Sequence, residues 1–338
     1  MMKEKLVLIG NGMAGVRTLE ALLKLEPDMY DITVFGAEPY GNYNRIMLSQ
    51  VLTGEKDIDE IMLNNEDWYK DNGITLHTDS EVVSINRQKR CVTSADGTEA
   101  SYDRLLMATG SNPIIIPIPG TNLPGVVAFR NIHDVESMLE TSTAYKKAVV
   151  IGGGLLGLEA ADGLLKQGME VTVIHLADNL MECQLDVPAA ALLKRSLEER
   201  GLSFEMASCT KAILGSERVT AVQLSDDREI PADLVVMATG IRPNIELAKN
   251  AGLHCEQGIV VNDSLQTFDP RVYAVGECVQ HRGQSYGLVA PLFDQAKVAA
   301  NHLARFGSMR YTGSITSTKL KVSGIDLFSA GYFSDDEN

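Results

Sequence analysis

The chain has 338 residues, enough to bury more than one hydrophobic core, so two or more domains are expected. Its formal net charge of −15 argues against a nucleic-acid-binding surface, which needs clustered Lys and Arg. No uninterrupted run of about 20 apolar residues occurs, so no membrane span is predicted. The opening residues "MMKEKLVLIG" lack the pattern of a secretory signal.

The five cysteines and six histidines show no recognisable ligand or disulfide pattern. The cysteine count is odd, and neither C-x-x-C nor H-x-x-x-H occurs. A disulfide framework, a metal site and a redox-active cysteine pair are therefore not expected. The cysteine usage predicts a reducing, cytoplasmic environment.

The first third of the chain has the pattern of a βαβ unit. Residues 5–10, "KLVLIG", form a short apolar run ended by glycine, typical of a buried parallel strand. Residues 15–25 have helical periodicity, and 30–36 predict the next strand. A helix is predicted over 58–72, followed by β-rich sequence up to residue 110.

The pattern then starts again after a proline-rich stretch, 111–120, which predicts a linker between domains. A strand, a glycine-rich turn and a helix begin at residue 147, a strand follows at 169–175, and a helix is predicted over about 187–201. Both halves close on Ala-Thr-Gly, at 108–110 and 238–240. Residues 269–280 are candidates to complete the first unit, and 317–333 read as two strands.

Each repeat carries a G-x-G-x-x-G fingerprint between its strand and its helix. The glycines are Gly10, Gly12 and Gly15 in the first copy and Gly152, Gly154 and Gly157 in the second. The first glycine allows a tight turn, the second lets a pyrophosphate approach the backbone, and the third lets helix and sheet pack closely. One such motif is weak evidence, but two copies in the same context predict two dinucleotide sites. One site would hold a flavin permanently, and the other would take a nicotinamide dinucleotide that exchanges.

With these motifs the chain resembles the two-dinucleotide flavoprotein reductases of the pyridine nucleotide-disulphide oxidoreductase superfamily, which include ferredoxin and rubredoxin reductases. It is most similar to the N-terminal part of the large subunits of assimilatory NAD(P)H-dependent nitrite reductases. The resemblance extends over nearly the whole chain, on the stretches "GAEPYGNYNRIMLSQVLTGE", "VVIGGGLLGLEAA", "LMECQLD", "MATGIRPN", "DPRVYAVGECVQHRG", "YGLVAPLFDQAKVAANHL" and "STKLKVSGIDLFSAG".

The resemblance implies an α/β fold of the glutathione-reductase type, with two Rossmann-like domains, the second inserted in the first. An FAD-binding domain would take residues 1–112 and 245–316, and an NAD(P)H-binding domain 113–244. Residues 317–338 would begin a C-terminal interface domain that the chain does not complete. The chain is therefore interpreted as a fragment, although a natural stand-alone protein is left open.

For FAD, the resemblance implies contacts by Gly10, Gly12, Met13, Ala14, Gly15, Glu38, Arg45, Val82, Ala108, Thr109, Gly110, Gly276, Glu277, Ala290 and Pro291. Glu38 would bind the adenosine ribose, although a solvated loop carboxylate is an alternative. Arg45 is alternatively a surface arginine, and Val82 a core residue. Glu277 stands where relatives usually have Asp and would accept from a ribityl hydroxyl, and Pro291 lies near a helix start beside the flavin ring.

For the nicotinamide nucleotide, the implied contacts are Gly152, Gly154, Leu155, Leu156, Gly157, Glu159, His175, Thr239 and Gly240. Glu159 would position the nicotinamide, or alternatively interact only with its own helix dipole. His175 occupies the ribose-sensing position and decides nothing between NADH and NADPH, because neutral it tolerates NADH and protonated it could meet a 2′-phosphate. A histidine that only ends its strand is the alternative.

Two absences narrow the class of reaction. Disulfide reductases, NADH peroxidases and coenzyme A-disulfide reductases of this fold need a cysteine near the flavin, and "NYNRIMLSQ" contains none. Cys278 is interpreted as a small packed residue. Ferredoxin-type reductases often carry Lys where this chain has Gln50.

The sequence thus predicts the FAD-dependent NAD(P)H dehydrogenase module of a nitrite reductase. Hydride would pass from NAD(P)H to FAD, and electrons would leave for iron–sulfur and sirohaem centres outside this chain that reduce nitrite to ammonia. No side chain is expected to act as general acid or base, and no metal is expected. A free-standing ferredoxin or rubredoxin reductase and a slow-turnover flavin-binding sensor are the alternatives. Nucleotide preference, electron acceptor, FAD retention and oligomeric state stay open, a homodimer of the full-length protein being one possibility.

Overall fold

The computed structural model describes residues 3–315, 317–322 and 325–330. The chain divides into two compact units. The first comprises Met1–Asn44, Met62–Asn112 and Arg242–Thr316, and the second Arg45–Ile61, Pro113–Ile241 and Ser317–Asn338.

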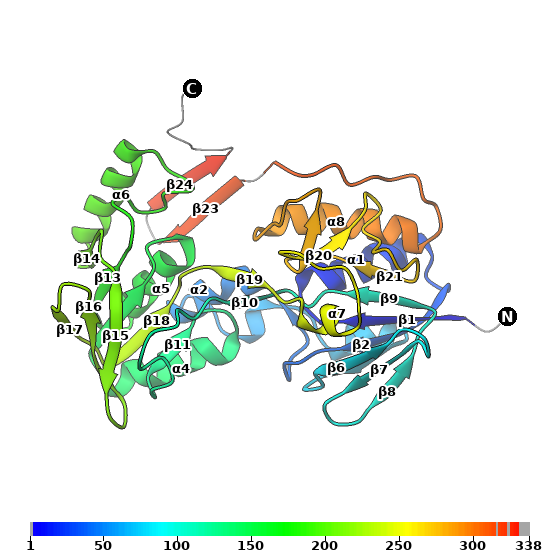
Figure 1. Ribbon diagram of the computed structural model, residues 1–338, viewed down its shortest axis with the longest axis horizontal. Coiled ribbons are helices and arrows are strands. Elements are labelled where there is room, and N and C mark those ends of the chain that lie inside the picture. The colour runs from blue at the N-terminus through cyan, green and yellow to red at the C-terminus, as the bar shows by residue number, and fades with distance from the viewer. Residues whose placement is uncertain (1–2, 316, 323–324, 331–338) are drawn as a thin grey trace. The chain divides into compact units, whose positions relative to one another are not determined.

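The first unit is built on a five-stranded parallel sheet, ordered β21-β9-β1-β2-β5 (Figure 1). Its central strand, β1, buries its last four residues on both faces, as expected for a parallel strand covered on each side. β21 joins the sheet beside β9 although it follows the whole second sheet in sequence. The strands are β1 (Glu4–Ile9), β2 (Tyr30–Phe35), β5 (Ile74–His77), β9 (Arg104–Met107) and β21 (Val272–Ala274).

Helices and a second sheet cover the two faces of this parallel sheet. In Figure 1, α1 (Met13–Leu25) and α8 (Val289–Leu303) lie on one side, and an antiparallel sheet of β6 (Val82–Asn86), β7 (Cys91–Ser94) and β8 (Glu99–Ser101) on the other. Leu8, Leu106 and Val275 are fully buried in the common core. The unit's other elements are β3 (Asn42–Tyr43), β4 (Met62–Asn64), α3 (Glu66–Asp71), α7 (Glu246–Asn250), β20 (Ile259–Val261) and β22 (Val279–His281).

The second unit repeats the plan with a five-stranded parallel sheet, ordered β11-β18-β12-β13-β14. Here the edge strand, β11, precedes the rest in sequence, whereas in the first unit the edge strand β21 comes last. The strands are β11 (Val126–Ala128), β12 (Lys147–Ile151), β13 (Glu170–Ile174), β14 (Ser203–Glu205) and β18 (Leu234–Met237).

Like the first unit, the second also contains a three-stranded antiparallel sheet. An antiparallel sheet is formed by β15 (Thr210–Gly215), β16 (Val219–Leu224) and β17 (Glu229–Pro231), and a hairpin by β23 (Ser317–Val322) and β24 (Ile325–Ala330). The helices are α2 (Leu48–Leu52), α4 (Ile132–Ala144), α5 (Leu155–Lys166) and α6 (Val187–Glu198), with short 3-10 turns at Arg45–Met47 and Asp59–Ile61. The chain passes between the units at β10 (Ser111–Pro113) and β19 (Ile241–Pro243), which pair with each other.

The sheets and helices confirm the predicted α/β class and the internal repeat. The predicted helix over 58–72 is wrong, because residues 62–64 are extended and pair with Asn42 and Tyr43. The helix starts only at Glu66, where the side chain of Asn65 caps it by accepting from the Trp68 N–H. The predicted domain limits and the interpretation of residues 317–338 as part of an interface domain stay predictions.

Candidate functional site

The two glycine fingerprints have the same backbone construction. Gly10 and Gly152 have φ of +101° and +121°, in the left-handed region that favours glycine. Gly10 N–H donates to Phe35 O, and Gly152 N–H donates to Ile174 O, each at 2.8 Å, which ties each turn to the end of the neighbouring strand.

The Ala-Thr-Gly segments pack against these turns, which explains why both halves contain them. A Cβ added to Gly10 would lie 2.1 Å from Ala108 O, and one added to Gly152 would lie 2.2 Å from Ala238 O. The threonines hold the segments in place, because the Thr109 hydroxyl donates to Asn244 O and the Thr239 hydroxyl to Ile114 O, both at 2.7 Å.

The third glycines bring helix and turn into contact. A Cβ on Gly15 would lie 2.8 Å from Gly10 O, and one on Gly157 would lie 1.9 Å from Gly152 O. Any larger residue would force α1 or α5 away from its sheet.

The second glycines face open space. A Cβ on Gly12 or on Gly154 would meet no atom within 4 Å, although both residues have ordinary backbone angles with φ of −84° and −82°. The free space lies where the fingerprint brings a pyrophosphate against the backbone. Each copy therefore fits a dinucleotide.

The helices at these turns lack the side-chain caps that two longer helices of the described part of the chain have. α4 and α6 are capped by the side chains of Asn131 and Asp186, which accept from backbone N–H groups of the first turn. α1 and α5 start at Gly12 and Gly154 and have no side-chain cap. Their first N–H groups have no carbonyl partner within the helix, so these ends suit an anion.

In the first unit, the structure brings several predicted FAD residues together. Gly276 lies against α1, since an added Cβ would be 3.1 Å from Ala14 Cβ. The Gly276 N–H donates to Oε1 of Gln295, a fully buried residue of α8. The neighbouring Glu277 accepts from the Ser111 hydroxyl at 2.6 Å. α8 begins without a side-chain cap and contains Ala290 and Pro291 in its first turn.

Three other predicted FAD residues, Glu38, Val82 and Arg45, each contact protein groups, and Arg45 belongs to the second unit. The Tyr43 hydroxyl donates to the Glu38 carboxylate at 2.7 Å. Val82 is 6% exposed and packs in the core of the first unit. Arg45 belongs to the second unit, where it donates to Arg130 O at 3.0 Å. Whether they contact a flavin stays a prediction.

In the second unit, two predicted nucleotide residues are buried. Glu159 lies on α5 with 5% of its surface exposed. His175 follows β13 and is 7% exposed. Its Nδ1 accepts from the Gly153 N–H at 3.0 Å, and its Nε2 lies 3.0 Å from Asn179 O and 3.1 Å from Glu182 Oε2. This contact between His175 and the glycine turn was not predicted. The additional glycine at 153 was the one feature of the sequence that could have indicated it.

Cys278 is fully buried, with its Sγ 3.3 Å from Val275 O, and burial raises the pKa of its thiol. These features agree with its interpretation as a packed residue rather than a redox group. Among the described residues, no cluster of three or more His, Cys, Asp or Glu side chains is arranged to hold a metal ion.

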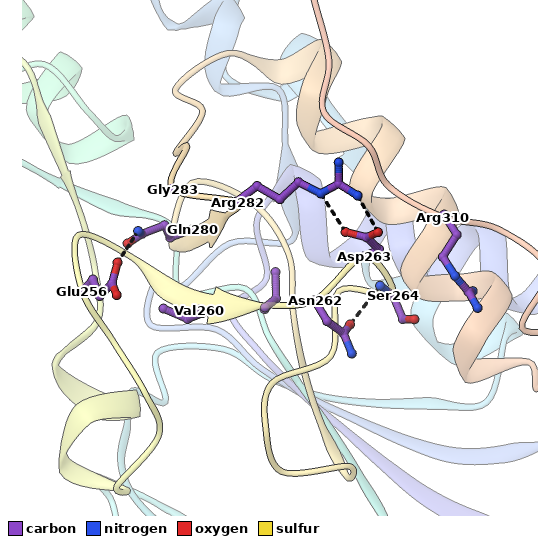
Figure 2. A pocket seen from close by; sticks show the side chains of 10 residues that line it. Glu256, Val260, Asn262, Asp263, Ser264, Gln280, Arg282, Gly283 and Arg310 are labelled. Atoms are coloured by element: carbon purple, nitrogen blue, oxygen red, sulfur yellow. Dashed lines mark hydrogen bonds and ion pairs between the residues drawn. The ribbon is translucent and has the colours of Figure 1, made fainter.

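A separate pocket of about 640 Å³ in the first unit contains none of the predicted site residues (Figure 2). Figure 2 shows Arg282 extending from the end of β22 to Asp263, with Nη2 and Nε at 2.6 and 3.0 Å from its carboxylate oxygens. Gln280 donates to Glu256 at 2.6 Å on the same lining. The charged groups Asp263 and Arg282 therefore compensate each other in this polar pocket.

The family model for pyridine nucleotide-disulphide oxidoreductases matches residues 4–302. The chain belongs to this family. In the described part of this oxidoreductase, no helix has both the length and the apolar character needed to cross a membrane.

Its relatives include nitrite reductases. The chain is 53% identical over 336 residues to "Nitrite reductase [NAD(P)H]" of Bacillus subtilis (strain 168), covering 99% of this chain and 42% of the relative. It is 48% identical over 337 residues to "Assimilatory nitrate reductase electron transfer subunit" of the same organism, covering 100% and 44%. The chain thus spans less than half the length of these relatives. Among solved structures, the NAD-dependent persulfide reductase from A. fulgidus superposes with a TM-score of 0.92 at 30% identity, covering 97% of this chain and 64% of that one.

Proposed function

We propose that this chain is the FAD-dependent NAD(P)H dehydrogenase unit of an assimilatory nitrite reductase. The observation that carries the proposal is the pair of open, uncapped glycine cradles, one in each compact unit. The similarity to nitrite reductase [NAD(P)H] along 99% of the chain supports the choice of reaction.

The first cradle is proposed to hold FAD. The N–H groups at the start of α1 would take the pyrophosphate, and Gly12 would leave room for it. Glu277, fixed by Ser111, would accept from a hydroxyl of the ribityl chain. When bound, FAD supplies the acceptor for a hydride from the nicotinamide ring.

The second cradle is proposed to hold NADH or NADPH as the exchanging substrate. The start of α5 would bind the pyrophosphate, with Gly154 leaving the space. Glu159, buried on the same helix, is the proposed positioner of the nicotinamide. The two ligands would then be held by FAD- and NAD(P)H-binding domains with the limits given by the sequence, 1–112 with 245–316 and 113–244.

The residues of this site bind and orient, and none is proposed to act as an acid or base. Substitution should therefore raise KM for the nucleotide or lower flavin occupancy. We further propose that electrons leave for iron–sulfur and sirohaem centres of a longer protein, in the cytoplasm, where the five free cysteines would stay reduced.

The proposal is tested by purifying the chain, measuring bound FAD by absorbance, and following the steady-state reduction of ferricyanide with NADH or NADPH. One FAD per chain and rapid turnover with at least one nucleotide are expected. Loading with FAD but negligible turnover would contradict the proposal and support a flavin-binding sensor. Rapid reduction of added ferredoxin or rubredoxin would instead favour a free-standing reductase.

A further inference from the structure

Both ring nitrogens of His175 lie within hydrogen-bond distance of protein groups. The Gly153 N–H donates to Nδ1 at 3.0 Å, so Nδ1 carries the lone pair and the ring proton sits on Nε2. That Nε2–H faces Asn179 O at 3.0 Å and the Glu182 carboxylate at 3.1 Å. With 7% of its surface exposed, the imidazole joins the glycine turn to the loop after β13.

Gly153 is held on both of its polar backbone groups. Its N–H is bound by His175, and its carbonyl accepts from the Met181 N–H at 3.1 Å. The peptide planes on either side of Gly153 are therefore both fixed. Because the Gly153–Gly154 peptide is trans, the Gly154 N–H points opposite to the carbonyl that Met181 holds.

The closeness of the imidazole also requires glycine at this position. A Cβ on Gly153 would lie 2.8 Å from His175 Cγ and 2.7 Å from Leu180 Cδ2. In the first fingerprint the larger residue stands in the turn instead. Asn11 takes the place of Gly153, and Gly36, which follows β2, takes the place of His175. A Cβ on Gly36 would lie 3.0 Å from Asn11 Cβ. Asn11 is itself held, accepting from the Tyr69 hydroxyl at 2.7 Å. Both turns are thus tied down, but by different side chains.

We infer that His175 is a positioning residue of the nucleotide site, which orders the Gly152–Gly154 backbone for a pyrophosphate and does not itself contact the adenosine ribose. The inference rests on the proposed function, because it needs a dinucleotide at this turn. It assigns His175 an effect on the affinity for both nucleotides and none on the preference between them. Replacing the ring should weaken both by the same factor.

Binding of ADP-ribose and of 2′-phospho-ADP-ribose, measured by calorimetry, tests this inference. These probes contain the pyrophosphate and differ only at the ribose 2′ position. His175→Leu removes the contacts of both ring nitrogens. We expect it to weaken each probe about tenfold, the cost of losing the one hydrogen bond that orders the turn. His175→Asn keeps an acceptor near the Nδ1 position and should restore most of the affinity. His254→Leu, exposed in the first unit, should change neither value.

Hydrogen exchange gives a readout that does not depend on a ligand. The Gly153 amide should exchange faster in His175→Leu than in the wild type, and His175→Asn should return it towards the wild-type rate. If His175→Leu weakened the affinity for the two probes by different factors, the inference would be overturned in favour of a ribose contact. Unchanged affinities, or an Asn variant as weak as the Leu variant, would also overturn it. A wild-type chain that binds neither probe would instead contradict the proposed function.

Discussion

At the scale of single residues, the glycines of each fingerprint differ in what they can tolerate. Gly12 and Gly154 have ordinary backbone angles and open space at the Cβ position, whereas Gly15 and Gly157 are in contact with the carbonyl of the first glycine. Substitutions at these positions therefore separate ligand binding from folding.

Gly12→Val should abolish FAD retention without unfolding the chain. The valine side chain would occupy the space proposed for the pyrophosphate, and its Cβ would meet no protein atom within 4 Å. We expect a colourless protein whose thermal midpoint is close to that of the wild-type apoprotein, measured by absorbance and circular dichroism.

The matched control is Gly154→Val, which should stay loaded with FAD and bind nucleotide at least about tenfold more weakly. A yellow, stoichiometrically loaded Gly12→Val variant would contradict the placement of FAD at the first fingerprint.

Gly157→Ala should destabilise the fold instead. The new methyl group would lie 1.9 Å from Gly152 O, so α5 must shift, and overpacking of this kind costs about 1–3 kcal/mol. Urea denaturation measures the loss. A variant as stable as the wild type would show that the helix moves away at no cost.

His175 shows what sequence reasoning could and could not supply at this scale. Its position after the second strand of a fingerprint predicted a role at the ribose. The inward direction of the ring depends on Gly153 and on the loop after β13, which contacts the turn only after folding. A third consecutive glycine was the only local indication.

At the scale of secondary-structure elements, the starts of α1 and α5 contrast with the start of α4. α4 has a capping box, in which Asn131 accepts from the Asp134 N–H at 2.9 Å and the Asp134 carboxylate accepts from the Asn131 N–H at 3.1 Å. The starts of α1 and α5 use no side chain. Their N–H groups are therefore available to the pyrophosphates proposed above.

Asn131→Ala should therefore lower the free energy of unfolding by about 1 kcal/mol, the usual value of an N-cap. FAD content should not change, because Asn131 is not among the residues proposed to hold FAD. Gly154→Ala is the control at an uncapped start, with a smaller loss of stability. Equal losses in both variants would contradict the distinction between the two kinds of helix start.

Asp263, which follows β20, forms an ion pair with Arg282, which follows β22. The Arg282 guanidinium and then His281 lower the pKa of Asp263 to about 2 from its usual 3.8. A lowered carboxyl pKa contributes stability above the unfolded value, and this is lost as the pH falls towards 2. Asp263→Asn should thus destabilise the chain at pH 7, and the difference from the wild type should shrink between pH 4 and 2 in urea denaturation. A difference independent of pH would contradict the role of the ion pair.

Elements with strong apolar patterns were predicted well and those set by pairing were not. The strands β1 and β12 are short apolar runs ended by glycine, and the helix after the first fingerprint has helical periodicity. Residues 62–64 are extended because of their partner strand at 42–43, which no local pattern announces. Likewise, Arg45 lies in the second compact unit, away in sequence from the segments that surround it there.

At the scale of the whole molecule, the same five-stranded parallel plan is built twice. The edge strand β21 is the last strand of the first sheet in sequence, whereas the edge strand β11 is the first strand of the second. The repeated fingerprint and Ala-Thr-Gly segment could be recognised in the sequence. The two backbones approach so closely that few residue types fit at the first glycines and the alanines. The two cradles fit the proposed hydride transfer, which needs a bound flavin and a bound nicotinamide nucleotide.

Hydride transfer between the two proposed ligands can be followed directly in an anaerobic titration. The purified chain, loaded with FAD, is titrated with NADH and with NADPH in separate experiments while its visible spectrum is recorded. We expect flavin absorbance near 450 nm that is bleached by about one equivalent of at least one nucleotide. A chain that holds FAD but is bleached by neither nucleotide would contradict the proposed hydride transfer.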